Sequence, residues 1–401
     1  MRHTKSRIRK RWMQSANCTS KHMRILKGLP GLVFVAVLYG VLIMGGLSGQ
    51  KTYSPMEKRQ LQTRPEVTVA GIKSGTFQEK LENSLSDQFP GRDRMVKLET
   101  DVKLLAGKRE INGVYFGKDD YLLEHYSKQD FKQKQLRKNF KALNAFVEEA
   151  SQNATVHVMM VPTKSWILQD KLPAFAPQYD EQQFYEELKS ALGKQAETVL
   201  VPVENVLREH RTEDIYYRTD HHWTTEGAWY GYEAYARAVG IDEKTVAGKK
   251  NFHCISTDFY GSTYAKVNRA SRADEIHIYE PEKPLTVVYN MGEKKEDTLY
   301  DSSFLKTQDQ YSVFTGGNQA VLEITGGEKN GKTLLLIKDS FANCLLPFLA
   351  EDYEKVIVVD LRQLNVNGAA LLDSFTPTEV LILYNSAQFA QDKEFAIKCG
   401  L

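Results

Sequence analysis

The sequence contains little cysteine, and its cysteines lie far apart. Four cysteines occur in 401 residues, and no two of them have the C-x-x-C spacing of a structural zinc site. Four are also too few for the disulfide scaffold on which small secreted proteins depend. A disulfide-rich fold and a zinc-finger-like fold are therefore excluded, while the disulfide state of Cys254, Cys344 and Cys399 stays open.

The chain also lacks a strong net charge, because basic residues in one segment offset an acidic remainder. The formal net charge is +2, yet residues 1–27 contain nine Lys or Arg and no Asp or Glu. Residues 28–401 therefore have a net charge of −7, the difference between +2 and +9. Nucleic acid repels an acidic folded part, so we predict no nucleic-acid partner.

A single long hydrophobic run follows the basic segment. Residues 28–50 are 23 residues without a charged side chain, and as a helix they would extend about 35 Å. This length crosses the hydrocarbon core of a bilayer, which is about 30 Å thick. Because a positive segment stays in the cytoplasm, we predict a single-pass protein of the cell membrane with residues 1–27 inside and the folded part outside. A cleaved signal peptide is the alternative.

The rest of the chain divides into a stem and a folded domain. Residues 51–110 are polar and interrupted by prolines, which predicts an extracytoplasmic stem. Residues 111–401 alternate β-branched apolar runs with helical patterns, which predicts an α/β domain with a parallel sheet and helices on both faces. We expect strands at 155–161, 198–203, 333–337, 355–359 and 380–384, and helices at 128–150, 180–192, 341–353 and 362–375. Pro347 should kink the helix at 341–353 or end its first half. Residues 241–330 predict a β-rich insertion.

The segment from Asp220 to Trp223 has the strongest chemical signal. In an extended chain alternate residues face the same way, so we expect Asp220 and His222 to lie side by side and His221 to point away. Asp220 would accept a hydrogen bond from one imidazole nitrogen of His222, which leaves the other nitrogen free to act as a base. An ordinary hydrogen-bonded pair is the alternative.

Ser340 is the serine best placed to be a nucleophile. It follows the expected strand 333–337 and precedes a helical pattern, so it lies where open α/β sheets bind ligands and where helix amides can hold an oxyanion. With His222 as the base and Asp220 as its partner, a Ser-His-Asp catalytic site results. A helix N-cap is the alternative role for Ser340.

The same motif raises the question of a metal. Asp220, His221 and His222 contain ligand atoms, and His253 and His277 could join them. Adjacent histidines point to opposite faces of an extended chain, however, so only one of the pair could share a site with Asp220. We therefore predict neither a metal nor another cofactor.

The motif TDHHW together with the distal KDSF resembles the DHHW family, which is similar to the alginate O-acetyltransferase-like branch of the SGNH hydrolases. Further similar segments are Glu57–Leu61 with Pro65, Asp87–Arg92, Val114–Leu123, Val161–Lys164, Phe259–Tyr264 and Tyr311–Asn318. The resemblance implies an SGNH-like fold and a catalytic triad of Ser340, His222 and Asp220. Lys338 replaces the glycine of the family's G-D-S motif, and we expect it to crowd the turn before Ser340.

Four other residues are candidates for contacts to the substrate or to an oxyanion. Lys164 matches a family feature near the site, with a solvated loop lysine as the alternative, and the remaining candidates are Asn318, Asn385 and Trp223.

The resemblance also implies a function. It implies an O-acyltransferase, such as an O-acetyltransferase, or a carbohydrate esterase that acts on a cell-surface or exported polysaccharide. The resemblance further implies that a multi-spanning membrane O-acyltransferase partner supplies the acyl group. The alternative is a catalytically inactive glycan-binding or assembly subunit of a polysaccharide modification system, and Lys338 in place of glycine favours this alternative.

The topology predicts which thiols can be reached from outside the cell. A membrane-impermeant thiol reagent on intact cells should leave Cys18 unlabelled, because Cys18 would lie in the cytoplasm. Cys254 and Cys399 should react once the external part has been unfolded. Labelling of Cys18, with Cys254 and Cys399 silent even after unfolding, would reverse the topology.

Overall fold

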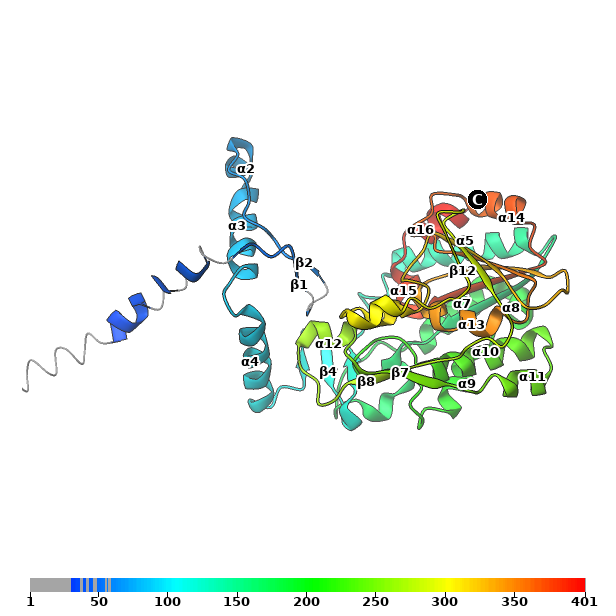
Figure 1. Ribbon diagram of the computed structural model, residues 1–401, viewed down its shortest axis with the longest axis horizontal. Helices are drawn as coiled ribbons and strands as arrows, with labels where there is room; N and C mark the ends of the chain where they lie inside the picture. Colours follow the sequence, from blue (N-terminus) through cyan, green and yellow to red (C-terminus); the bar gives the residue numbers. More distant parts are fainter. Residues whose placement is uncertain are drawn as a thin grey trace, which may run out of the picture. The chain divides into compact units, whose positions relative to one another are not determined.

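The computed structural model describes residues 30–36, 39–40, 43–45, 49–54, 56 and 59–400 (Figure 1). The predicted cytoplasmic tail, residues 1–27, lies outside these residues, and the predicted membrane segment 28–50 is described only in short pieces. Among the described residues, no helix combines the length and the apolar composition needed to cross a bilayer.

The chain forms two compact units, with a boundary at Lys97 and with residues 56–58 belonging to the second unit. The first unit contains the ribbon β1 (Tyr53–Ser54) and β2 (Arg59–Gln60) and the helices α2 (Val69–Ser74) and α3 (Thr76–Asp87). The buried Asp87 carboxylate accepts hydrogen bonds from the Arg59 guanidinium and from the Gln62 amide. The Arg59 guanidinium also lowers the pKa of Asp87. Helix α4 (Arg92–Leu105) begins in this unit and continues into the second.

The second unit is built around a seven-stranded sheet with the order β10-β9-β11-β13-β12-β14-β6. Strands β13, β12, β14 and β6 are parallel, whereas β10, β9 and β11 are antiparallel to their neighbours. The bounds are β6 (Thr155–Val161), β9 (Thr286–Tyr289), β10 (Lys294–Glu296), β11 (Val321–Thr325), β12 (Thr333–Lys338), β13 (Lys355–Val359) and β14 (Glu379–Asn385). The sheet is thus mixed, and the prediction of a parallel sheet was wrong for β9, β10 and β11. Strands β9 and β10 are joined by a short turn, which permits antiparallel pairing only.

Side chains of the parallel strands alternate between two hydrophobic layers. Leu334 and Leu336 of β12 pack into one layer, and Leu335 and Ile337 pack into the other. The first layer is covered by α9 (Val203–Glu209), α10 (Thr225–Val239) and α13 (Leu346–Leu349), and the second by α5 (Gln133–Ala150), α7 (Gln182–Leu192), α15 (Ser386–Gln391) and α16 (Glu394–Cys399) (Figure 1). Strands buried on both faces explain the continuous apolar runs in the sequence.

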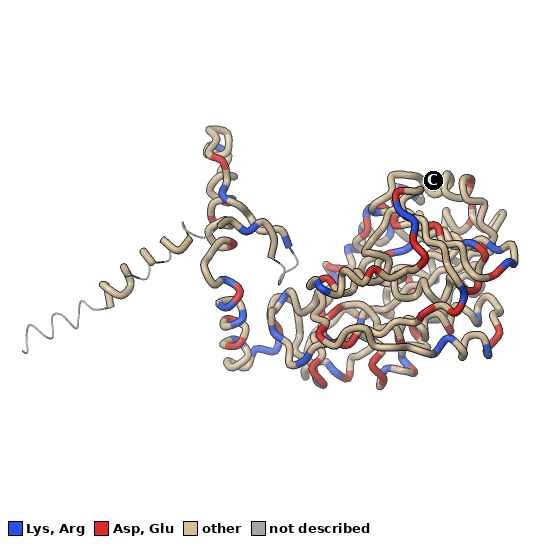
Figure 2. Tube along the Cα trace, viewed as in Figure 1, with Lys and Arg blue, Asp and Glu red and all other residues tan. Residues whose placement is uncertain are grey.

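Two smaller sheets lie in the same unit. One contains β3 (Glu110–Ile111), β4 (Val114–Phe116) and β5 (Leu122–Glu124), and the other is a ribbon of β7 (His253–Phe259) and β8 (Asp274–Ile278). The other helices are α6 (Lys164–Ile167), α8 (Ala196–Val199), α11 (Glu243–Gly248), α12 (Ser262–Val267) and α14 (Gly368–Phe375), and the 3-10 turns are η1 (Lys118–Asp120), η2 (Gln169–Lys171), η3 (Gly193–Gln195), η4 (Ser302–Lys306), η5 (Gln310–Val313) and η6 (Ser340–Cys344). Basic and acidic residues are interspersed along this unit (Figure 2).

The helix expected at 362–375 begins only at Gly368, and proline affects two further expected elements. Residues 198–203 are no strand: α8 ends at Val199, Leu200 forms a single bridge to Val158, and α9 begins after Pro202. Proline has no N–H to donate to a sheet, so pairing cannot continue there. The helix expected at 341–353 is the short turn η6 followed by α13, with Pro347 at the start of α13. Proline is tolerated in the first turn of a helix but not in its interior.

Helix α10 packs very closely on the segment that precedes it. The Thr224 hydroxyl caps the helix by accepting a hydrogen bond from the Gly227 amide, at 3.1 Å. A Cβ atom on Gly227 would lie 2.1 Å from the Ile215 carbonyl oxygen, and one on Gly231 would lie 2.7 Å from the Trp223 ring. Both positions therefore require glycine for close approach.

We predict that Gly227→Ala lowers the free energy of unfolding by about 1–3 kcal/mol or more, because the new methyl group meets backbone that cannot move aside. Denaturant-induced unfolding of the purified protein measures this change. Gly248→Ala is the matched control: it is also a helical glycine, but its added Cβ has no neighbour within 4 Å. The control should alter stability by no more than about 1 kcal/mol, and equal losses in both variants would contradict the packing argument.

Candidate functional site

Ser340 lies just beyond the end of the central strand β12. The preceding residue, Asp339, anchors the turn: its carboxylate accepts hydrogen bonds from the Phe341 amide at 2.9 Å and the Asn385 amide at 2.7 Å. The Asp339 amide donates to the Leu383 carbonyl at 3.1 Å. Ser340 is therefore held at the carboxyl edge of the sheet. The Phe341 amide, which we expected to be available for an oxyanion, is already bound by Asp339.

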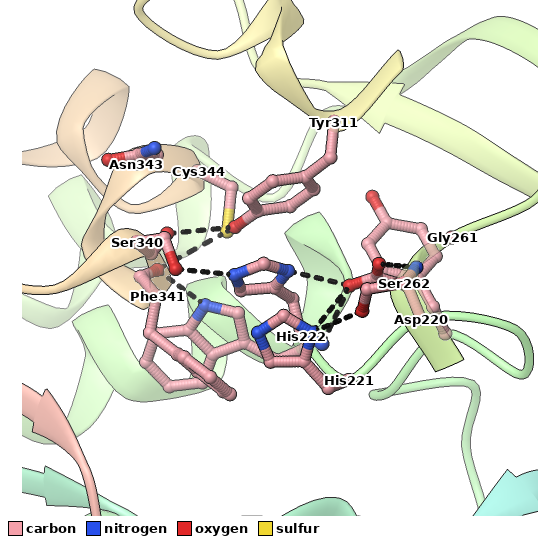
Figure 3. A network of polar contacts seen from close by, with 12 residues as sticks. Asp220, His221, His222, Gly261, Ser262, Tyr311, Ser340, Phe341, Asn343 and Cys344 are labelled. Carbon is pink, nitrogen blue, oxygen red and sulfur yellow. Dashed lines mark hydrogen bonds and ion pairs between the residues drawn. The ribbon is translucent and has the colours of Figure 1, made fainter. Parts of the chain in front are cut away.

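The structure brings Ser340, His222 and Asp220 together (Figure 3). The Nε2 atom of His222 lies 2.8 Å from Ser340 Oγ, and its Nδ1 atom lies 2.6 Å from Asp220 Oδ1. Asp220 and His222 are buried, and Ser340 is partly exposed. A carboxylate can only accept, so it selects the tautomer of His222 with the proton on Nδ1, and Nε2 can then accept the proton of the serine hydroxyl.

The Asp220 carboxylate is fixed by the chain that follows strand β7. Its Oδ2 atom accepts the Ser262 amide at 2.6 Å, while Oδ1 accepts the His222 amide at 2.9 Å. A Cβ atom on Gly261 would lie 2.3 Å from Asp220 Oδ2, so glycine is required for this approach. Asp274 of β8 holds the preceding turn, because its carboxylate accepts the Arg218 and Thr219 amides, each at 2.7 Å.

Lys164 has a different role from the one predicted. It is 3% exposed, and its ammonium group donates to the carbonyl oxygens of Asp220 at 2.7 Å and Tyr217 at 3.0 Å. Burial lowers the pKa of Lys164 to about 8. Lys164 therefore braces the turn that contains Asp220 and does not face a substrate.

Trp223 and Asn385 also differ from the prediction. The Trp223 indole is completely buried, and its N–H donates to the Phe341 carbonyl at 2.8 Å, so it links the histidine segment to the serine turn. The Asn385 amide group donates to Val161 and accepts the first amides of α15. Both side chains are hydrogen-bonded to protein partners, as buried polar groups must be.

The lysine in place of glycine does not crowd the serine turn. Lys338 is the last residue of strand β12, so its backbone is extended and needs no glycine. Its side chain is buried, and its ammonium group donates to the side-chain oxygens of Asn343 at 2.7 Å and Asn318 at 3.2 Å. Burial lowers the pKa of Lys338 to about 8. The predicted candidate Asn318 thus belongs to a polar cluster around Lys338.

His221 does not point away from His222 as predicted. The two rings have centroids 3.8 Å apart, and His221 Nδ1 lies 2.5 Å from Ser262 Oγ (Figure 3). Residues 218–222 form bends and no strand, so the alternation of an extended chain does not apply. Ligand atoms of Asp220, His221 and His222 consequently lie within 4.8 Å of one another. The geometric argument against a metal here was therefore wrong, although an ion would have to displace the hydrogen bonds of both imidazoles.

Tyr311 is the functional neighbour that the sequence reasoning missed. Its ring stacks on the His222 imidazole with centroids 3.9 Å apart and an interplanar angle of 8°. Its hydroxyl donates to the Ser340 carbonyl at 3.2 Å (Figure 3). Burial raises the pKa of Tyr311 well above its usual value, so the phenol stays neutral. The one signal in the sequence was its place in the family-like segment Tyr311–Asn318.

A groove is lined by residues from the two chain segments that contact Asp220 and His222. It has a volume of about 450 Å³ and is lined by Tyr260, Tyr264, Asp258, Gln310 and the loop Leu305–Gln308, together with Met56. The rings of Tyr260 and Tyr264 have centroids 4.7 Å apart. Tyr260 directly precedes Gly261 in the chain, and Gln310 directly precedes Tyr311. Neither this groove nor a larger cavity of about 700 Å³ among α7, α8 and α9 is lined by Asp220, His222 or Ser340.

The chain is similar to one protein family and to several solved structures. A family described as DHHW protein matches residues 119–359. A DHHW family protein from Eubacterium siraeum is 23% identical with a TM-score of 0.62, over 73% of this chain and 97% of that chain. Bacillus cereus PatB1 with a sulfonyl adduct is 21% identical with a TM-score of 0.57, over 70% and 97%. The O-acetyltransferase domain of Pseudomonas putida AlgJ is 12% identical with a TM-score of 0.44, over 72% and 98%. No curated protein gives a significant match.

The buried carboxyl group of Glu181, which is bound by Thr163, makes stability depend on pH. Glu181 accepts hydrogen bonds from the hydroxyls of Thr163 and Ser386, and burial raises its pKa from 4.5 to about 7. The folded state therefore favours the neutral carboxyl. The stabilisation that this preference supplies is complete below about pH 4.5 and is lost as the pH rises through about 7.

We predict that Glu181→Gln, which imitates the neutral carboxyl group, removes this pH dependence. A shift of this size corresponds to a change on the order of 3 kcal/mol between about pH 4.5 and pH 7. Unfolding midpoints measured across this range test the prediction. The exposed Glu209→Gln serves as the control and should keep the wild-type slope. An unchanged slope in Glu181→Gln would show that Glu181 is ionised throughout.

Proposed function

The chain belongs to the DHHW protein family, and from this membership and the geometry at Ser340 we propose that it is an O-acyltransferase or acyl esterase that acts on a polysaccharide. The observation that carries the proposal is the continuous series of hydrogen bonds from Asp220 through His222 to Ser340. A serine hydroxyl is a weak nucleophile unless a base accepts its proton, and this series supplies the base.

The proposed mechanism uses the same three side chains in both half-reactions. His222 Nε2 takes the proton of Ser340 while Oγ attacks the carbonyl carbon of an acyl ester, and His222 then gives the proton to the leaving oxygen. In the second half-reaction a sugar hydroxyl (in a transferase) or water (in an esterase) attacks the acyl-enzyme while His222 takes its proton, and His222 then returns the proton to Ser340 Oγ as the bond between Oγ and the acyl group breaks. Asp220 stabilises the imidazolium that forms in both steps.

Several surrounding contacts support this role for His222. The flat face of Tyr311 lies against the imidazole, and a π face is favourable next to a cation. Lys164 and Asp274 hold the turn on which Asp220 sits. The imidazole is therefore fixed in one orientation before substrate binds, which lowers the reorganisation needed in the reaction.

The groove beside the site supports a sugar acceptor. The Tyr260 ring is exposed, and an aromatic face can pack against the C–H face of a pyranose ring while hydroxyl and amide groups bind the sugar hydroxyls. In this proposal a polysaccharide lies along the Tyr260 and Tyr264 rings, and one of its hydroxyl groups reaches the acyl-enzyme.

The location and the partner are further parts of the proposal. The nine basic residues in 1–27 and the uncharged run 28–50 support an anchor in the cell membrane with the catalytic part outside the cytoplasm. The family resemblance supports a multi-spanning membrane O-acyltransferase as the partner that supplies the acyl group.

We expect Ser340→Ala and His222→Ala each to reduce turnover of 4-nitrophenyl acetate on the order of 10⁴-fold, and the double variant to be little worse, because members of a triad act as a unit. A sulfonyl fluoride is a suitable probe, since PatB1 has been obtained with a sulfonyl adduct. It should label the wild type and fail to label Ser340→Ala.

The control is His221→Ala, which should stay active and lose on the order of 1 kcal/mol of stability from packing. A folded but inactive His221→Ala together with an active His222→Ala would exchange the two roles. An unlabelled wild-type protein without turnover would support the glycan-binding subunit instead. Mass analysis of surface-glycan acetylation in cells with and without Ser340 then tests the polysaccharide itself.

A further inference from the structure

A second group of reactive side chains lies on the β7–β8 ribbon. Cys254 of β7 is directly opposite His277 of β8 in the antiparallel register. Glu275 precedes His277 by two residues, so both side chains project from the same face of the strand. The sulfur of Cys254, a ring nitrogen of His277 and a carboxylate oxygen of Glu275 all lie within 4.8 Å of one another.

These three groups are suited to one kind of ligand. Thiolate, imidazole and carboxylate are the ligands that Zn²⁺ accepts, with bonds of about 2.0–2.3 Å in a tetrahedral arrangement. Contact distances within the group are already short, since His277 Nε2 lies 3.3 Å from Glu275 Oε2. Cys254 is exposed, and the side chains of His277 and Glu275 are 42% and 58% exposed, so they can adjust by rotation without disturbing a core.

We propose that Cys254, His277 and Glu275 form a binding site for one thiophilic divalent cation of the Zn²⁺ class. The ion takes the three protein ligands, and water completes the fourth position. Binding converts the Cys254 thiol to a thiolate and releases its proton to solvent. The site uses none of the residues of the Ser340 site, so it does not depend on the proposed catalytic function.

The position of the group in the fold indicates what the ion does. The ribbon is irregular, because its register shifts between Cys254 and Ser256 and again between Ser256 and Phe259. A two-stranded ribbon of this kind has little stability of its own. An ion held by Cys254 from one strand and by His277 and Glu275 from the other connects the two strands across the irregular part.

The same ribbon supports the Asp220 turn. Asp274 of β8 binds the Thr219 amide, and Gly261 and Ser262, which follow β7, contact the Asp220 carboxylate. The His277 carbonyl also accepts a hydrogen bond from the Thr225 hydroxyl at the start of α10. A cation on the ribbon therefore stabilises the strands that hold Asp220 in place, and its role is structural.

Titration of the reduced, metal-free full chain with Co²⁺ tests the site without any measurement of activity. We expect a near-ultraviolet thiolate-to-cobalt charge-transfer band at one equivalent, which Zn²⁺ removes by displacement. Cys254→Ser should abolish the band. His277→Ala should weaken binding by more than about tenfold, because even the loss of an outer-shell partner of a metal costs that much.

The matched control is His253→Ala, which removes the histidine adjacent to Cys254 that lies outside the group. It should leave the band and the Co²⁺ affinity unchanged. Zn²⁺ should also raise the thermal unfolding temperature of the wild type and leave that of Cys254→Ser unchanged, since only a folded site binds the ion. Absence of the band in the wild type, or its persistence in Cys254→Ser, would overturn the proposal.

Discussion

The buried carboxylate of Asp220 is the interaction on which the geometry of the site depends. A carboxylate that is 2% exposed is costly unless its oxygen atoms are paired, and here both are. One oxygen accepts the amide and the Nδ1–H group of His222, and the other accepts the Ser262 amide. The surrounding chain meets this requirement with Gly261, where a side chain would collide with the carboxylate, and with Lys164, which holds the Asp220 carbonyl. The hydrogen bonds that satisfy the buried Asp220 carboxylate therefore also hold the His222 imidazole in one orientation.

The sheet supplies the other half of the arrangement. Parallel strands end at a common edge, and β12 places Ser340 at that edge, 118 residues after His222 in the sequence. Two aromatic side chains join the halves: the Trp223 indole binds the carbonyl of the residue after Ser340, and Tyr311 stacks on His222 while its hydroxyl binds the Ser340 carbonyl. Lys338 fits the same edge because its extended backbone needs no glycine and its ammonium group finds buried acceptors.

The β7–β8 ribbon connects the different functions that we assign to this part of the molecule. The ribbon holds the Asp220 turn through Asp274 on one strand and through Gly261 at the end of the other. The loop after β7 also contributes Tyr260 to the groove where we propose that the sugar chain binds. The cation that we propose at Cys254, His277 and Glu275 would connect the two strands of this irregular ribbon, which holds the Asp220 turn.

Features that depend on neighbouring residues could be read from the sequence. The apolar runs of β6, β12, β13 and β14, the pairing of Asp220 with His222 and the place of Ser340 after a strand all follow from local patterns and from the rule that parallel strands share an edge. Local patterns did not predict that β9, β10 and β11 are antiparallel or that His221 lies against His222. They also did not predict the hydrogen-bond partners of Lys164, Trp223 and Asn385. A buried donor must find an acceptor, but its partner comes from a distant segment, and packing decides which segment is near. Tertiary structure also decides that Cys254 lies opposite His277, because the spacing of these residues in the sequence does not predict the pairing of their strands.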